Sequence, residues 1–227
     1  MIEIIEKYLD CLGEEFHRYH SWDYCKEVFD KRGSEELKAK ELALYLASWG
    51  MYRGSGGLLQ TNYSIHLGAI QILQSDRFRN LKCDERREVV VESIPDILGL
   101  RNELRHHYSS ITYVRGIEDR RPISPTDTLI TKVLLGTYSC VPAYDRHFLK
   151  GLRESGFSQY KFDANSLVEI FDFISGHYQE IEESQNVILR RFNKHYPIMK
   201  VIDMYFWQIG YDADLEERRN NPAHEDF

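Results

Sequence analysis

The stretch that decides the fold runs from 124 to 152 and reads SPTDTLITKVLLGTYSCVPAYDRHFLKGL. Pro125 suits the first turn of a helix, with Ser124 as its N-cap. The turn GTYSCVP, residues 136–142, ends this helix, and a second helix is expected from about 143 to 154. Apolar residues recur at helical spacing in the first helix: Leu129, Ile130, Val133 and Leu134.

Helical periodicity continues along most of the chain, and proline is rare, with six residues in 227. We therefore predict an all-α protein of about nine or ten helices, folded as a two-lobed helical bundle. It would be a single domain over 1–227, divisible into sub-lobes 1–108 and 125–212, with a charged tail at 213–227. Residues 109–124 are expected to form an exposed irregular loop. The other segments expected to be helical are 2–19, 22–31, 35–52, 62–74, 84–94 (or a short strand at 89–91), 95–108, 163–183, 186–192 and 196–210.

Composition limits the classes of partner. The formal net charge is −7, which argues against a broad basic surface but leaves room for a local basic groove that binds DNA. The four cysteines form no C-x-x-C pair, so we expect reduced, mostly buried thiols, no cofactor and no metal. The acidic N-terminus and the lack of a long apolar run predict a cytoplasmic protein without a membrane segment.

Asp145 opens the second helix of the stretch, beside Arg146 and His147. A carboxylate in a first helical turn is stabilised by the helix dipole by about 0.3–1 kcal/mol, and this common arrangement is the simpler interpretation. The alternative is a catalytic carboxylate at the edge of a cleft, where it orients water or stabilises a developing cation. Arg146 and His147 would then contact substrate, His147 by donating to a phosphate; His147 could equally be a surface residue.

Residues 124–152 resemble the core of the helix–hairpin–helix base-excision DNA glycosylases. In that superfamily a helix, a short turn and an apolar-Pro-apolar-Asp segment lead into the next helix, as VPAYD does at 141–145. The resemblance implies an enzyme of DNA repair or DNA modification that hydrolyses an N-glycosidic bond, with Asp145 as catalytic carboxylate. Some members also carry a lysine on the preceding helix that attacks the sugar C1′. Lys132 is the one lysine in that helix, so the resemblance implies this role for it.

Two features qualify the resemblance. Lys132 lies a turn or more into its helix, which favours a solvated lysine on the polar face. The superfamily's Gly-x-Gly hairpin, whose N–H groups bind phosphate, is replaced by EDRRPISPT at 118–126. Arg120 and Arg121 would then either contact phosphate as simple charges or solvate the loop.

A second candidate site is WGMYRGSGG at 49–57. Trp49, Tyr52 and Arg53 precede a glycine-rich loop, a pattern that suits a pocket for an extruded base. The alternative is that Trp49 and Tyr52 fill the core while the glycines turn the chain. His17, His20 and Asp23 are spaced for a metal, but no further ligands can be placed, so we expect no metal site.

Two functions remain open. The first is a DNA glycosylase-like enzyme, with or without lyase activity, in which Asp145 assists hydrolysis and Trp49, Tyr52 and Arg53 shape the pocket. The second is a catalytically inactive helical module that binds nucleic acid or protein on the same scaffold. The VPAYD segment favours the enzyme, whereas the acidic charge and the missing hairpin glycines favour the module.

Overall fold

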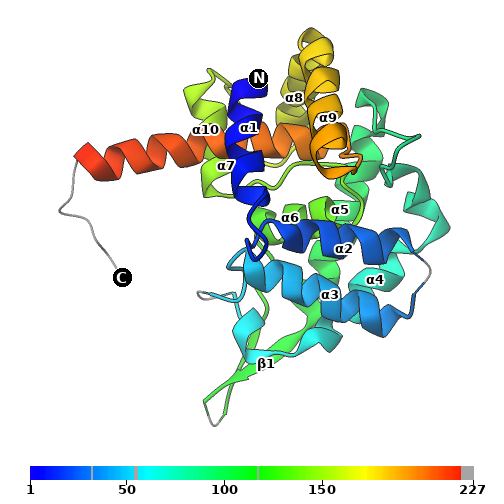
Figure 1. Cartoon of the computed structure of the whole chain (residues 1–227). Coiled ribbons are helices and arrows are strands. Elements are labelled where there is room, and N and C mark those ends of the chain that lie inside the picture. Colours follow the sequence, from blue (N-terminus) through cyan, green and yellow to red (C-terminus); the bar gives the residue numbers. More distant parts are fainter. Residues whose placement is uncertain (32, 54–55, 117, 221–227) are drawn as a thin grey trace.

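The computed structural model describes residues 1–31, 33–53, 56–116 and 118–220 (Figure 1). Within this part the chain is predominantly helical, which confirms the all-α prediction, and its single sheet is a two-stranded antiparallel hairpin. The α-helices are α1 (Ile2–Leu12), α2 (His20–Asp30), α3 (Glu35–Ser48), α4 (Leu67–Leu73), α5 (Ile94–Ser110), α6 (Asp127–Thr137), α7 (Arg146–Glu154), α8 (Ala164–Gly176), α9 (Tyr178–Phe192) and α10 (Ile198–Asn220). The strands are β1 (Thr112–Arg115) and β2 (Asp119–Pro122), and 3-10 turns lie at Leu58–Gln60, Tyr63–His66, Asp76–Leu81 and Val91–Ser93.

Several predictions of local structure are wrong, among them the single helix over 163–183, which the structure divides at His177 into α8 and α9. The segment 109–124 is not an irregular loop, because Thr112 pairs with Pro122 and Arg115 with Asp119 in the β1–β2 hairpin. Residues 84–90 form neither a helix nor a strand. The predicted tail from 213 is helical as far as Asn220, because α10 continues through it; residues 221–227 lie outside the described part.

Helix α6 lies near the centre of the fold, where it contacts α2, α3 and α5 (Figure 1). Every residue from Leu129 to Thr137 is buried, so α6 has no solvent-facing side over this length. Its N-cap is Thr126, whose hydroxyl accepts from the Leu129 N–H at 3.2 Å. The predicted cap Ser124 and the predicted start at Pro125 are therefore two residues too early.

Helices α7 and α10 cross in direct backbone contact. A methyl group built on Gly151 of α7 would overlap the carbonyl oxygen of Phe206 of α10. A methyl group built on Gly210 of α10 would likewise overlap the carbonyl oxygen of His147 of α7. Each helix thus contributes one glycine to the crossing. These contacts fix the position of α7 along α10 and the angle between the two helices.

Among the described helices, none combines the length and the apolar character that crossing a bilayer requires.

The crossing makes a stability prediction. Gly151→Ala should lower the free energy of unfolding by about 3 kcal/mol, because the added methyl meets a backbone carbonyl that cannot rotate away. Gly176→Ala is the matched control: nothing lies within 4 Å of its new methyl, and alanine at an exposed helix end should be neutral or stabilising by up to about 1 kcal/mol. Urea denaturation followed by circular dichroism measures the free energy of unfolding of both variants. Equal values for the two variants would contradict a backbone contact between α7 and α10 at Gly151.

Candidate functional site

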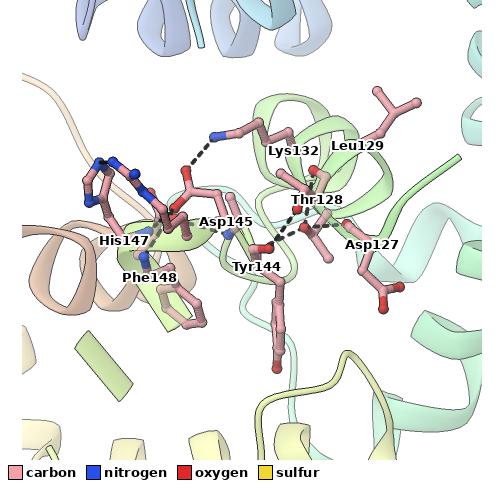
Figure 2. A network of polar contacts seen from close by, with 12 residues as sticks. Asp127, Thr128, Leu129, Lys132, Tyr144, Asp145, His147 and Phe148 are labelled. Atoms are coloured by element: carbon pink, nitrogen blue, oxygen red, sulfur yellow. Dashed lines mark hydrogen bonds and ion pairs between the residues drawn. The ribbon is translucent and has the colours of Figure 1, made fainter. Parts of the chain in front are cut away.

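Asp145 is the N-cap of α7, and its side chain closes the first turn of that helix. Its Oδ1 accepts hydrogen bonds from the backbone N–H groups of His147 and Phe148, each at 3.1 Å (Figure 2). One carboxylate oxygen therefore caps the helix, in agreement with the simpler interpretation of a carboxylate that stabilises a helix start. Helix α7 begins at Arg146 rather than at the predicted Ala143, because residues 141–144 are a buried non-helical segment and the Asp145 N–H donates to the Ala143 carbonyl oxygen in a tight turn.

The second carboxylate oxygen binds Lys132. The Lys132 Nζ donates to Asp145 Oδ2 at 2.8 Å, and the two side chains are only 4 % and 14 % exposed (Figure 2). The expectation of a solvated Lys132 on a polar helix face is wrong, since α6 is buried around its whole circumference here. The structure thus brings together the two residues that the resemblance names as carboxylate and nucleophile.

Two hydroxyl groups of α6 hold the chain that leads into Asp145. The Tyr144 N–H donates to the Thr131 hydroxyl at 2.9 Å, and the Thr128 hydroxyl donates to the Tyr144 carbonyl oxygen at 2.9 Å (Figure 2). Both polar backbone groups of Tyr144 are therefore bonded to the helix that carries Lys132. This double contact fixes the Asp145 carboxylate relative to the Lys132 ammonium group.

Opposing effects act on the Asp145 carboxyl. Burial is the largest of these effects, and by itself it raises the pKa of the carboxyl. The pKa is lowered by the charge and hydrogen bond of Lys132, by the hydrogen bond from the Phe148 N–H and by the charge of His147. The net result is a pKa below the ordinary value. The carboxylate is accordingly ionised at neutral pH, as its pairing with an ammonium group requires.

A second buried ion pair lies beside the first. The Lys200 Nζ is 3.3 Å from Asp203 Oδ2, and the other Asp203 oxygen accepts from the Ala143 N–H at 3.0 Å. Burial raises the pKa of Asp203 and lowers that of Lys200. The sequence analysis missed this pair, although two charges three residues apart within the apolar run of α10 are a visible signal.

Aromatic rings cover the two ion pairs. The Trp49 ring lies 4.7 Å from the Lys132 Nζ and meets the Trp207 ring edge to face at 5.7 Å, and the exposed Arg18 guanidinium lies 4.8 Å from the Trp49 ring. The space left between these side chains does not admit a water-sized sphere. Its walls are Tyr45, Trp49, Lys132, Leu135, Ala143, Asp145, Lys200, Asp203 and Trp207.

The other predicted pocket residues lie elsewhere. The Tyr52 hydroxyl bonds to His66 Nε2 at 3.1 Å, and His66 Nδ1 in turn bonds to the Tyr108 hydroxyl at 2.8 Å. Tyr52 thus belongs to a different polar network and packs against the core. Arg53 is exposed. Neither residue lines the space beside Asp145, and residues 54–55 of the glycine-rich loop lie outside the described part.

Arg146 and His147 face α10 and do not point into the space beside Asp145. The Arg146 Nη2 lies 2.9 Å from Asp214 Oδ2, and the His147 ring packs edge-on against Trp207 at 5.1 Å between centroids. Burial lowers the pKa of His147. Both residues therefore occupy the rim of the site, and their contacts join the first turn of α7 to α10.

Metal-ligand geometry is not found among the described residues, where no three acidic, histidine or cysteine side chains converge. His20 Nδ1 lies 3.9 Å from Asp23 Oδ2, but Asp23 is also bound by the Tyr196 hydroxyl at 2.8 Å and by Lys194 at 2.9 Å. The four cysteines are free, with Cys11 half-buried and the others buried.

Comparison with known proteins identifies no relative of this chain. No protein-family model matches the sequence, no curated protein matches it significantly, and no solved structure matches the fold significantly.

The Lys132–Asp145 pair makes a pH-dependent prediction. In Lys132→Met the carboxylate keeps its burial and loses its cation, so its pKa should rise above the ordinary value. The native pair stabilises the fold at neutral pH, and this contribution fades only as pH falls through the lowered Asp145 pKa. The variant should therefore lose about 3 kcal/mol of unfolding free energy at pH 8 and clearly less at pH 5.

Urea denaturation at several pH values measures this loss. The control is the double variant Lys132→Met, Asp145→Asn, which has no charge at either position of the pair. Its loss of unfolding free energy relative to the native chain should not show the pH dependence expected for Lys132→Met. A loss that is the same at every pH would show that the pair carries no electrostatic stability.

Proposed function

We propose that this chain is a DNA glycosylase-like enzyme that hydrolyses the N-glycosidic bond of a modified or extruded base, with Asp145 as the catalytic carboxylate. The observation that carries the proposal is the buried Lys132–Asp145 ion pair at the start of α7. The carboxylate is ionised and held in place on both oxygens. A fixed negative charge in a site shielded from water is what stabilises a positively charged sugar as the base departs.

The reaction balances without a cofactor. The C1′–N bond breaks, its electron pair leaves with the base, and the base takes up a proton. Water adds to C1′ and gives its proton to Asp145. In a lyase variant, Lys132 first passes a proton to Asp145, and its neutral amine adds to C1′ in place of water as the base departs. The nitrogen of this adduct then loses a proton, the C1′–O4′ bond breaks, O4′ takes up a proton, and a protonated Schiff base results.

Access to the pair requires Trp49 to move. Its ring lies against Lys132, and the space behind it does not admit a water-sized sphere. Trp49 follows the last turn of α3 and precedes Gly50, whose φ of 75° lies in the left-handed region. In this proposal a nucleotide displaces the indole and stacks in its place.

The second candidate function is an inactive helical module that binds nucleic acid or protein. One observation favours it: both Asp145 oxygens already have partners, and the space beside them is narrow. A carboxylate in that state serves helix capping and ion pairing alone. The two candidates differ in whether Asp145→Asn, which keeps the capping oxygen, abolishes a reaction.

The test is single-turnover release of bases from a panel of damaged and modified DNAs, single- and double-stranded, read as alkali-sensitive strand breaks. Asp145→Asn should reduce the rate by at least about 100-fold, because it removes the charge that stabilises the transition state. A panel on which the native chain releases no base would favour the module and end the glycosylase proposal.

Lys132→Arg separates hydrolysis from lyase chemistry. Arginine preserves the positive charge beside Asp145 but cannot form a Schiff base. For a lyase, borohydride should trap the native chain on DNA and fail to trap Lys132→Arg. Equal trapping of both proteins would remove Lys132 as the nucleophile, and absence of trapping with base release intact would leave a hydrolase only.

A further inference from the structure

Several cations gather around one carboxylate where α7 crosses α10. Asp214 Oδ2 lies 2.9 Å from Arg146 Nη2, 3.3 Å from Arg218 Nη2 and 4.0 Å from His147 Nδ1. Its other oxygen lies 3.5 Å from Lys150 Nζ. We call these four basic residues and Asp214 the Asp214 cluster.

The Asp214 cluster carries surplus positive charge. It holds two arginines, a lysine and a histidine against Asp214 and Glu217, whose carboxylate lies 2.6 Å from Lys150 Nζ, and the adjacent Asp145 carboxylate is already paired with Lys132. This surplus stands out in a chain whose formal net charge is −7. It lies immediately beside Asp145, the residue before Arg146, at the rim of the candidate site.

Helix packing does not account for the two exposed arginines of the cluster. The side chains of Arg146 and Arg218 are 66 % and 63 % exposed, and ion pairs of such exposure contribute about 0–1 kcal/mol at most to stability. The α7–α10 contact is already fixed by the glycines at the crossing. Exposed guanidinium groups that converge on one oxygen instead match the way arginine binds a phosphate.

We propose that the Asp214 cluster contacts the phosphate backbone of DNA next to the nucleotide at Asp145, an inference that rests on the proposed function. In the structure the Asp214 carboxylate occupies the position of a phosphate and holds the cations together. A DNA phosphate competes with it for Arg146 and Arg218. Asp214 is therefore a local competitor that weakens DNA binding.

The test is fluorescence anisotropy with a labelled 20-nucleotide duplex and its single strand at low salt. Asp214→Asn should tighten binding about fivefold, whereas Arg146→Ala and Arg218→Ala should each weaken it by a similar factor. Each arginine removed should also reduce the slope of log Kd against log salt by about 1. Thermal melts establish whether each variant is folded. If Asp214→Asn does not fold, the test rests on Arg146→Ala, which replaces an exposed side chain.

Glu36→Gln is the matched control, because it neutralises an exposed carboxylate that pairs with Lys40 at 2.6 Å on α3. It should leave DNA affinity within twofold of the native value. Equal tightening in Asp214→Asn and Glu36→Gln would reflect net charge alone and overturn the assignment. So would unchanged affinity in Arg146→Ala and Arg218→Ala, or no binding of either DNA by the native chain.

Measuring DNA affinity and base release on the same proteins distinguishes this inference from the proposed function. If the cluster binds DNA, the native chain should bind the duplex or the single strand whether or not it releases a base. Native-like binding with no base release by any protein would remove the enzyme and leave the DNA surface in place. Arg146→Ala and Arg218→Ala could instead release base and bind DNA with native affinity. That result would contradict the phosphate-binding role of the cluster and support the enzyme.

Discussion

The backbone contact between α7 and α10 is the constraint on which the candidate site depends. Gly151 and Gly210 allow the two helices to touch at their main chains. That contact sets where α7 begins and therefore where its N-cap, Asp145, stands. The same crossing brings Arg146 against Asp214 and the Lys200–Asp203 pair beneath the chain that leads into α7. A wider spacing of the helices would move the carboxylate away from Lys132.

Burial of four charged groups in one small region has to be balanced electrostatically. Lys132 with Asp145 and Lys200 with Asp203 form two pairs of opposite sign, so the region carries no formal excess charge. Such pairs seldom increase stability relative to apolar side chains of similar size, because removing each charge from water costs several kcal/mol. Buried charged pairs of this kind occur both at functional sites and in structural ion-pair networks.

Local sequence signals predicted most of the helices. Apolar residues at helical spacing identified most α-helices, and the sequence placed Asp145 in the first turn of a helix, although α7 begins three residues later than the predicted Ala143. The same signals failed where partners distant in sequence decide the structure. The β1–β2 hairpin is short and almost wholly exposed, so its strands show no apolar alternation. Helix α10 extends to Asn220 with charged residues that resemble a tail.

The sequence by itself determined the helical class and the presence of an acid at the start of a helix, because periodicity and helix-start preferences act over a few residues. Only the tertiary structure decided that Lys132 is buried, since the helix surface around it is covered by segments distant in sequence. It also decided that Trp49 reaches the ion pair while Tyr52 joins His66. Pairing of side chains across helices depends on how the helices pack, and this is set by close contacts such as the one between α7 and α10.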